Sequence, residues 1–310
     1  MVRLPVIASD AAPAGRRLPE WMKRPLPGLA DFAHTRRTVA ESGVATVCQE
    51  ARCPNLSECW SKRHATFMIL GDRCTRRCHY CAVDTAKPLP PAADEPVRLA
   101  EAVADLGLKH VVVTAVSRDD LPDAGAAHFA ACVRAMRAAS PQMTIEVLPA
   151  DFHARRDRIA MLVAAQPDLY NHNLEMVARL TPAIRPQGDY QRSLDVLRIV
   201  KELDPGTLTK SGLMVGLGET EDELLEAFAD LRGVDCDVLT VGQYLQPTRT
   251  GHWPVKRFYT PEEFDRLADA ARALGFLSVA AGPFVRSSYN AEEVFTRTRT
   301  ARAAQEGTNG

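Results

Sequence analysis

Cys74, Cys78 and Cys81 form a Cys-x3-Cys-x2-Cys set that directly follows a short apolar run. Three thiolates this close can bind three irons of a four-iron cluster, and the fourth iron then stays open to an outside ligand. An open iron can chelate the amino and carboxylate groups of S-adenosylmethionine (SAM) and reduce its sulfonium, which generates a radical able to take hydrogen from unactivated carbon. The spacing therefore predicts radical chemistry, with zinc bound by the cysteines and His79 as the alternative.

Cys48, Cys53 and Cys59 form a second triplet upstream of the first. Such close thiols again indicate a cluster, and because the first set already has sufficient ligands, the second set predicts a separate metal group. The alternative is a small zinc knuckle completed by His64. We therefore expect two [4Fe-4S] clusters in one chain.

The composition limits the partners of the chain. Its 310 residues carry 38 basic and 39 acidic side chains, a formal charge of −1, so no global field favours nucleic acid or an anionic membrane. No apolar run reaches the roughly 18 residues of a spanning helix, and the N-terminus lacks the apolar region of a signal peptide. We expect a cytoplasmic protein whose clustered cysteines stay reduced, with Cys132 and Cys236 as structural thiols.

The elements that position these cysteines are predicted from hydrophobic periodicity. Apolar runs alternate with amphipathic stretches, which is typical of an α/β fold with a mainly parallel sheet. Thr220 with Glu223, and Thr260 with Glu263, predict two capped helix starts. We expect strands at 65–70, 110–116, 143–148, 168–173, 208–216, 237–243 and 276–281, and helices at 97–107, 127–139, 190–203 and 221–232.

This order predicts a partial barrel of about six strand–helix units, in which ligands bind at the carboxyl ends of the strands. The loop that carries Cys74 follows the first of these strands, so we expect it at that edge. We expect an extended N-terminal arm at 1–40, an auxiliary-cluster segment at 41–63, the barrel at 64–282 and a C-terminal tail at 283–310.

Seven motifs, the first two of which contain cysteines of the triplets, occur in a fixed order: EARCPNLSECW, GDRCTRRCHYCAV, SRDDLPDAGA, NHNLE, KSGLMVGLGE, GQYLQPT and VRSSYNAEE. In order and spacing, over roughly residues 18 to 295, they resemble the lipoyl synthase family of radical SAM enzymes. The resemblance implies a partial (β/α)6 barrel of radical SAM type with N-terminal and C-terminal extensions. It also implies a sulfurtransferase that inserts two sulfur atoms, at C6 and C8, into an octanoyl group on a lysine of a lipoyl carrier domain.

In this family the second cluster is consumed as the sulfur donor. The resemblance therefore implies three partners: the octanoylated carrier domain or protein, a low-potential electron donor, and an iron–sulfur carrier that rebuilds the cluster. It also implies that a serine of the motif Arg286-Ser287-Ser288-Tyr289 binds the remaining iron, and it points to Ser288, although sequence alone leaves Ser287 open. A serine oxygen is a harder donor than thiolate, so its iron should be the easiest to release.

Asn171, Asn173 and Glu175 lie at the end of a predicted strand, where amides and a carboxylate can bracket ribose hydroxyls. The same stretch resembles a segment of biotin synthase that contacts SAM. We therefore expect these three residues to contact the cofactor. The alternative is that Asn171 and His172 pair with the backbone at the strand end.

Three other segments carry weaker predictions. We expect the loop 118–123 to be hydrogen-bonded near the site, and the backbone amides of 216–219 to face a carboxylate or phosphate. Five basic residues could steer an acidic carrier or reductant, but each one is more simply interpreted as a solvated loop charge: Arg73, Arg76, Arg77, Lys256 and Arg257.

Two other functions stay open at this point. A biotin-synthase-like enzyme would also insert sulfur by radical chemistry, but that family lacks the Cys48–Cys59 triplet and the serine motif. A zinc or electron-transfer protein would bind metal without turnover. The two triplets together with the serine motif favour the lipoyl synthase interpretation.

Overall fold

One eight-stranded sheet forms the centre of the protein. The structure, a computed structural model, describes residues 18–23 and 30–308. The strands follow the chain order from β1 to β8; β2 to β8 run parallel, and β1 pairs with β2 in the antiparallel sense. They are β1 (Ala45–Thr46), β2 (Thr66–Ile69), β3 (His110–Ala115), β4 (Thr144–Leu148), β5 (Leu169–Asn171), β6 (Leu208–Val215), β7 (Val238–Gln243) and β8 (Ser278–Gly282).

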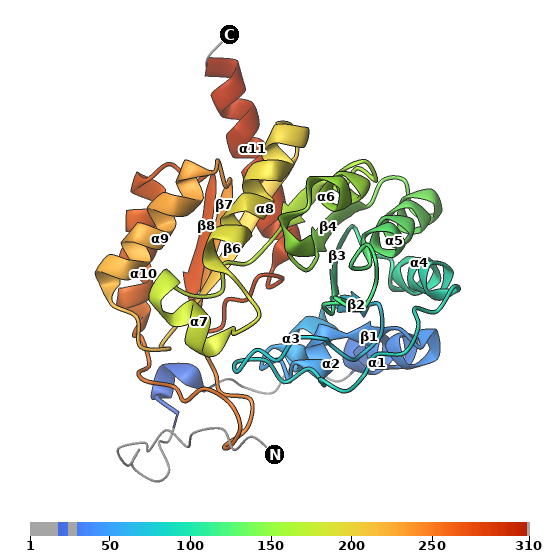
Figure 1. Ribbon diagram of the computed structural model, residues 1–310, viewed down its shortest axis with the longest axis horizontal. Helices are drawn as coiled ribbons and strands as arrows, with labels where there is room; N and C mark the ends of the chain where they lie inside the picture. The colour runs from blue at the N-terminus through green and yellow to red at the C-terminus, as the bar shows by residue number, and fades with distance from the viewer. Residues whose placement is uncertain (1–17, 24–29, 309–310) are drawn as a thin grey trace.

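Six helices cross over between successive parallel strands and cover the outer face of the sheet (Figure 1). They are α4 (Glu95–Leu106), α5 (Ala126–Ala139), α6 (Arg156–Val163), α8 (Tyr190–Leu203), α9 (Glu221–Gly233) and α10 (Pro261–Ala273). The other helical segments are η1 (Glu20–Met22), α1 (Ala30–Ser42), α2 (Val47–Glu50), α3 (Leu56–Ser61), η2 (Phe152–Ala154), η3 (Ala178–Leu180), α7 (Thr181–Ile184) and α11 (Ala291–Thr308). Because β1 and β8 stay unpaired edges, the sheet is an open barrel, which confirms the predicted partial (β/α)6 fold.

The parallel strands are buried on both faces, which explains why their sequences are nearly continuous apolar runs. In β3, for example, Val111 and Val113 are fully buried and Val112 between them is nearly so. Both predicted capping boxes also form, since Thr220 and Thr260 each accept a bond from the backbone three residues on. The helices α9 and α10 therefore start where local sequence predicts.

The N-terminal region differs from the prediction. Of the expected arm at 1–40, residues 1–17 and 24–29 lie outside the described residues, and the expectation of extended chain is wrong from Ala30 on, because α1 is a helix. Its local periodicity is weak, and its stability comes from packing: Phe32 lies 5.7 Å from the ring centre of Trp60 in α3. The short strand β1 was also missed.

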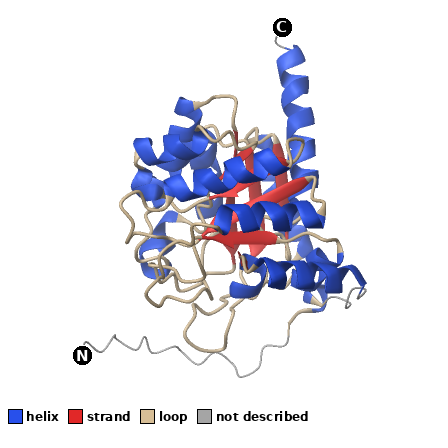
Figure 2. Cartoon of the chain, turned by 90° about the vertical axis from the view of Figure 1, so that its right-hand side faces the viewer, coloured by secondary structure: helices blue, strands red, loops and turns tan. Residues whose placement is uncertain are grey.

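The C-terminal region closes the open side of the sheet. A loop follows β8, and α11 then contacts both β8 and β3, which lie near opposite edges of the sheet. The far end of α11 projects from the body of the protein (Figure 2). None of the helices in the described part of the chain is long and apolar enough to cross a lipid bilayer.

Candidate cluster sites

The first cysteine triplet lies in the loop after β2, at the carboxyl ends of the parallel strands. Cys74 Sγ accepts hydrogen bonds from the backbone N–H groups of Arg76 (3.4 Å) and Ser117 (3.3 Å). Such bonds favour a thiolate and tune a cluster bound to it. Burial raises the pKa of Cys81 to about 12 and also raises that of Cys78, so the positive charge of a bound metal is what would hold them as thiolates.

Ligand spacing separates the zinc and cluster interpretations. Tetrahedral zinc with Zn–S bonds near 2.3 Å places its sulfurs about 3.8 Å apart. Over the described residues, the one group of three His, Cys, Asp or Glu side chains whose donor atoms all lie within 4.8 Å of one another is Glu95, His128 and Cys132. In neither cysteine triplet do all three sulfur atoms lie within 4.8 Å of one another, an arrangement that suits thiolates bound to different irons better than thiolates bound to one zinc ion.

Arg76 lies between two cysteines of the first triplet and is 5% exposed, so its interpretation as a solvated charge is wrong. Its guanidinium donates two bonds to Asp119 (2.7 and 2.8 Å) and two to Asp151 (2.7 and 2.8 Å). Burial raises the pKa of Asp151, but the bonds and charge of Arg76 lower it more, so the net pKa is below the usual range. The expected loop beside the site is confirmed, because Asp119 follows β3 and also accepts from Thr75 Oγ1 (2.9 Å).

The three predicted cofactor contacts have two different environments. Asn173 and Glu175 are half-buried beyond β5, and Asn173 Nδ2 donates to Glu175 Oε1 (3.2 Å). Asn171 is fully buried within β5, where Nδ2 donates to Glu146 Oε1 (2.8 Å). His172 Nδ1 pairs with a backbone carbonyl, that of Pro149 (3.3 Å), as the alternative for that residue predicts. Asn171 therefore faces the interior of the barrel, and Asn173 and Glu175 its rim.

Arg185 is a candidate that sequence reasoning missed. It is 8% exposed, and although burial lowers its pKa, electrostatic interaction with Tyr80, Glu175 and Cys78 raises the pKa more. Burial in turn raises the pKa of Glu175, and Arg185 opposes that shift. A buried cation therefore acts electrostatically on a cysteine of the first triplet and on the Glu175 carboxylate. No local pattern marks Arg185, because only the fold brings it to this loop.

The backbone amides of the loop 216–219 bind a carboxylate that belongs to the loop itself, that of Glu219. The backbone N–H groups of Gly216, Leu217 and Gly218 donate to the carboxylate of Glu219 at 2.6, 2.9 and 2.9 Å. Gly216 and Gly218 have φ of +94° and +117°, which residues with a Cβ rarely adopt. The predicted carboxylate is thus confirmed as Glu219, which occupies these amides.

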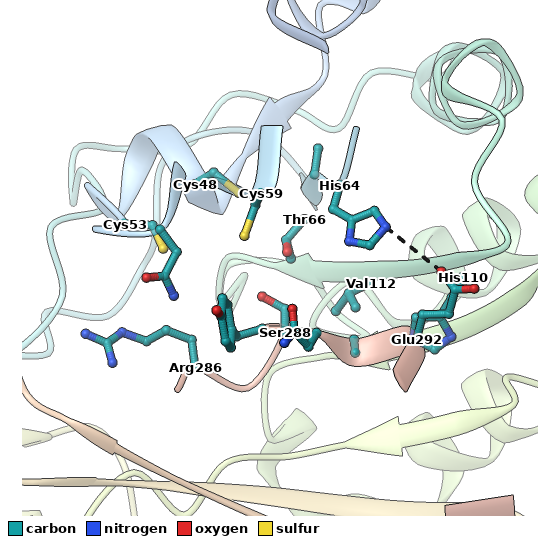
Figure 3. A pocket seen from close by; sticks show the side chains of 15 residues that line it. Cys48, Cys53, Cys59, His64, Thr66, His110, Val112, Arg286, Ser288 and Glu292 are labelled. Carbon is teal, nitrogen blue, oxygen red and sulfur yellow. Dashed lines mark ion pairs between the residues drawn. The ribbon is translucent and has the colours of Figure 1, made fainter. Parts of the chain in front are cut away.

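The second triplet lines one cavity together with Ser288 (Figure 3). Cys48 comes from α2, Cys53 from the loop after it and Cys59 from α3, whereas Ser288 comes from the turn after β8. Burial raises the pKa of Cys59 to about 12 and raises that of Cys48. His64 also lines the cavity, 3.9 Å from Glu292. Side chains more than two hundred positions apart therefore meet at one cavity, and Ser288, not Ser287, is among its lining residues.

Glycine at position 242 lets the C-terminal segment enter the barrel. A Cβ on Gly242 of β7 would lie 2.1 Å from the carbonyl oxygen of Val285, so the segment passes directly over this strand. The auxiliary-cluster segment holds it from the other side, since Asn55 Nδ2 donates to Phe284 O (2.7 Å) and Tyr289 Oη donates to Glu58 Oε1 (2.9 Å). These contacts fix the position of Ser288.

Replacing Gly242 with alanine should therefore displace the C-terminal segment. Because real Cβ atoms essentially never approach within 3.0 Å, the Val285 backbone must move and Ser288 with it. We expect reconstituted protein to lose the auxiliary cluster and keep the radical cluster, measured as iron per chain and by electron paramagnetic resonance. The matched control is Gly233→Ala, where an added Cβ meets nothing within 4 Å. Full auxiliary iron in Gly242→Ala would contradict the proposed path.

Comparison with known protein families identifies the superfamily of this chain. Residues 68–231 match the radical SAM superfamily, and with the open barrel and the cysteine loop after β2 they define a radical SAM protein. The chain is 50% identical to lipoyl synthase from Rubrobacter xylanophilus and 51% identical to that from Methylococcus capsulatus, each over 94% of this chain and 90% of the relative. The chain belongs to the lipoyl synthase family.

Solved structures share the fold. Methylornithine synthase (PylB) superposes with a TM-score of 0.53 and 14% identity, over 69% of this chain and 70% of that one. HydG, a maturase of the [FeFe]-hydrogenase, gives a TM-score of 0.56 and 14% identity, over 86% and 75%. At such low identity the likeness concerns the fold alone, and it confirms the partial barrel of radical SAM type.

The cofactors of the family are SAM and [4Fe-4S] clusters, and the side chains of this chain fit them. The six cysteines of the two triplets are free thiols and could therefore act as sulfur donors. Asn171 Oδ1 and Asn173 Oδ1 are buried acceptors without a hydrogen-bond partner in the described part of the structure. Buried polar atoms of this kind are nearly always paired, so these two acceptors suit the donors of a bound cofactor.

Proposed function

We propose that this chain inserts two sulfur atoms, at C6 and C8, into an octanoyl group carried on a lysine of a lipoyl carrier domain. The observation that carries the proposal is the cavity where Cys48, Cys53 and Cys59 meet Ser288. This cavity lies on the same open barrel as the loop with the first cysteine triplet. One barrel therefore offers a site for hydrogen abstraction and a site for sulfur donation.

At the first site, Cys74, Cys78 and Cys81 hold the radical cluster. When bound and reduced, this cluster supplies the electron that cleaves SAM and thereby provides the agent that abstracts hydrogen. Arg76 fixes the loop between the ends of β3 and β4, and Asn171, Asn173 and Glu175 offer acceptors to the cofactor. The buried cation of Arg185 opposes the rise in pKa that burial causes at Glu175.

At the second site, Cys48, Cys53, Cys59 and Ser288 hold the auxiliary cluster. The serine oxygen is the hardest of these four donors, so its iron is the most easily released. A cluster that gives up sulfur must lose iron, and the weakest ligand sets where that loss begins. Ser288 lies in a turn, and the neighbouring Tyr289 is bonded to Glu58, so the segment that carries this ligand lies outside the strands of the barrel.

The partners follow from this reaction: an octanoylated lipoyl carrier domain, a low-potential electron donor and an iron–sulfur carrier that rebuilds the auxiliary cluster. The reaction needs neither nucleic acid nor a membrane. The segment 41–63 and the tail 283–310 act as the auxiliary-cluster module, and 64–282 as the radical barrel. A reducing compartment such as the cytoplasm keeps the six cysteine ligands available.

The proposal is tested with anaerobically reconstituted protein, reductant, SAM and an octanoyl-lysine peptide. The unmodified chain should form 5′-deoxyadenosine and a peptide whose mass increases by two sulfurs. Cys53→Ala, which removes an auxiliary ligand, should still form 5′-deoxyadenosine and yield no thiolated peptide. SAM cleavage without thiolated product in the unmodified chain would refute the assigned substrate, and a colourless, zinc-loaded preparation would refute the clusters.

A further inference from the structure

The two serines of the C-terminal motif face different sites. Tyr289 N donates to Arg286 O (2.9 Å), which closes a turn with Ser287 and Ser288 at its centre. Ser288 lines the auxiliary cavity, whereas Ser287 Oγ accepts a bond from Asn173 Nδ2 (3.3 Å). Adjacent residues of one turn therefore contact the auxiliary site and the rim of β5, where the proposed cofactor contacts lie.

Two hydrogen bonds, to Ser287 and to Glu175, together fix the orientation of the Asn173 amide. Asn173 Nδ2 donates to Ser287 Oγ and to Glu175 Oε1, which uses both of its N–H groups. A carboxylate only accepts, so Nδ2 must face Glu175, and Oδ1 must point the other way. That oxygen points toward β6, where a Cβ on Gly212 would lie 2.9 Å from it. Oδ1 is buried and has no partner among the described residues.

We propose that Ser287 is a positioning residue for SAM. Ser287 holds the Asn173 amide so that the free Oδ1 of Asn173 and the Glu175 carboxylate face the cofactor. This inference rests on the proposed function, because it takes Asn173 and Glu175 as cofactor contacts. Since Ser287 shares a turn with the auxiliary ligand Ser288, the turn links the affinity for SAM to the position of that ligand. The motif thus needs two serines for two separate tasks.

The test compares Ser287→Ala with Ser287→Thr and Ser288→Ala in protein reconstituted with both clusters. The Kd for SAM is measured by anaerobic equilibrium dialysis, and iron is counted per chain. Ser287→Ala loses one neutral hydrogen bond, so its Kd should rise roughly threefold to tenfold while its iron content is unchanged. Ser287→Thr keeps the hydroxyl and should bind SAM as the unmodified chain does. Ser288→Ala should lose auxiliary iron.

A second comparison shows whether Ser287 acts through Asn173. In an Asn173→Ala background, Ser287→Ala should have no further effect on the Kd for SAM, because the bond it removes is already absent. Additive effects, or an unchanged Kd in Ser287→Ala with full iron, would overturn the positioning role and leave the proposed function intact. Loss of auxiliary iron in Ser287→Ala but not in Ser288→Ala would instead refute the ligand assignment of the proposed function.

Discussion

Cys78→Ala is expected to remove the radical cluster and to reduce 5′-deoxyadenosine formation below detection. Three thiolates are the minimum that holds a four-iron cluster with one open iron, and two cannot replace them. The protein should keep its auxiliary cluster, so its iron content should fall to about half. The measurements are iron per chain, electron paramagnetic resonance of the reduced protein, and 5′-deoxyadenosine by mass spectrometry.

Cys236→Ala is the control, because it removes a thiol that belongs to neither triplet. Burial raises the pKa of Cys236 to about 12, and its Sγ bonds the Val238 carbonyl far from both triplets in sequence. We expect full iron and full SAM cleavage in this variant. Normal SAM cleavage in Cys78→Ala would show that Cys74, Cys78 and Cys81 do not hold the radical cluster.

The features predicted from sequence are those that local chemistry determines. The cysteine triplets are short motifs whose cysteines are close in the chain, and the capping boxes of Thr220 and Thr260 span four residues each. The seven parallel strands are mostly apolar runs, and all of them formed near the predicted positions. The family resemblance added what spacing does not contain, which is the link between Ser288 and a triplet more than two hundred positions away.

The features that sequence did not predict depend on distant partners. In the sequence Arg76 resembles any other solvated charge in a loop. It is buried because it pairs with Asp119 and Asp151, which follow two other strands. Asn171 belongs to the motif of Asn173, yet it lies inside β5, where it donates to Glu146, whereas Asn173 lies beyond the end of the strand. Helix α1 has little periodicity of its own and forms because α3 and α4 cover it.

Because Arg76 is buried and paired, replacing it should lower the stability of the fold. Arg76→Ala leaves the fully buried carboxylate of Asp151 without its bidentate partner, although Arg192 Nε stays 3.0 Å away. Breaking a buried ion pair from one side costs several kcal/mol, and we expect the free energy of unfolding to fall by about 3 kcal/mol. Retention of the radical cluster should fall with it, because the loop loses its attachment to β3 and β4.

The control is the neighbouring residue, Arg77, which is exposed, so Arg77→Ala should change the unfolding free energy by less than about 0.5 kcal/mol.

The effect of pH gives an independent check. The pKa of Asp151 lies below its usual value, so this carboxylate stabilises the fold above an unfolded pKa of about 3.9 and loses that effect as the pH falls through the lower folded pKa. Urea unfolding should therefore show that Arg76→Ala lowers the free energy of unfolding, relative to the unmodified chain, most near neutral pH and less in acid. Arg77→Ala should show little difference at either pH. A loss of unfolding free energy that is independent of pH would mean that Arg76 contributes through packing and not through its charge.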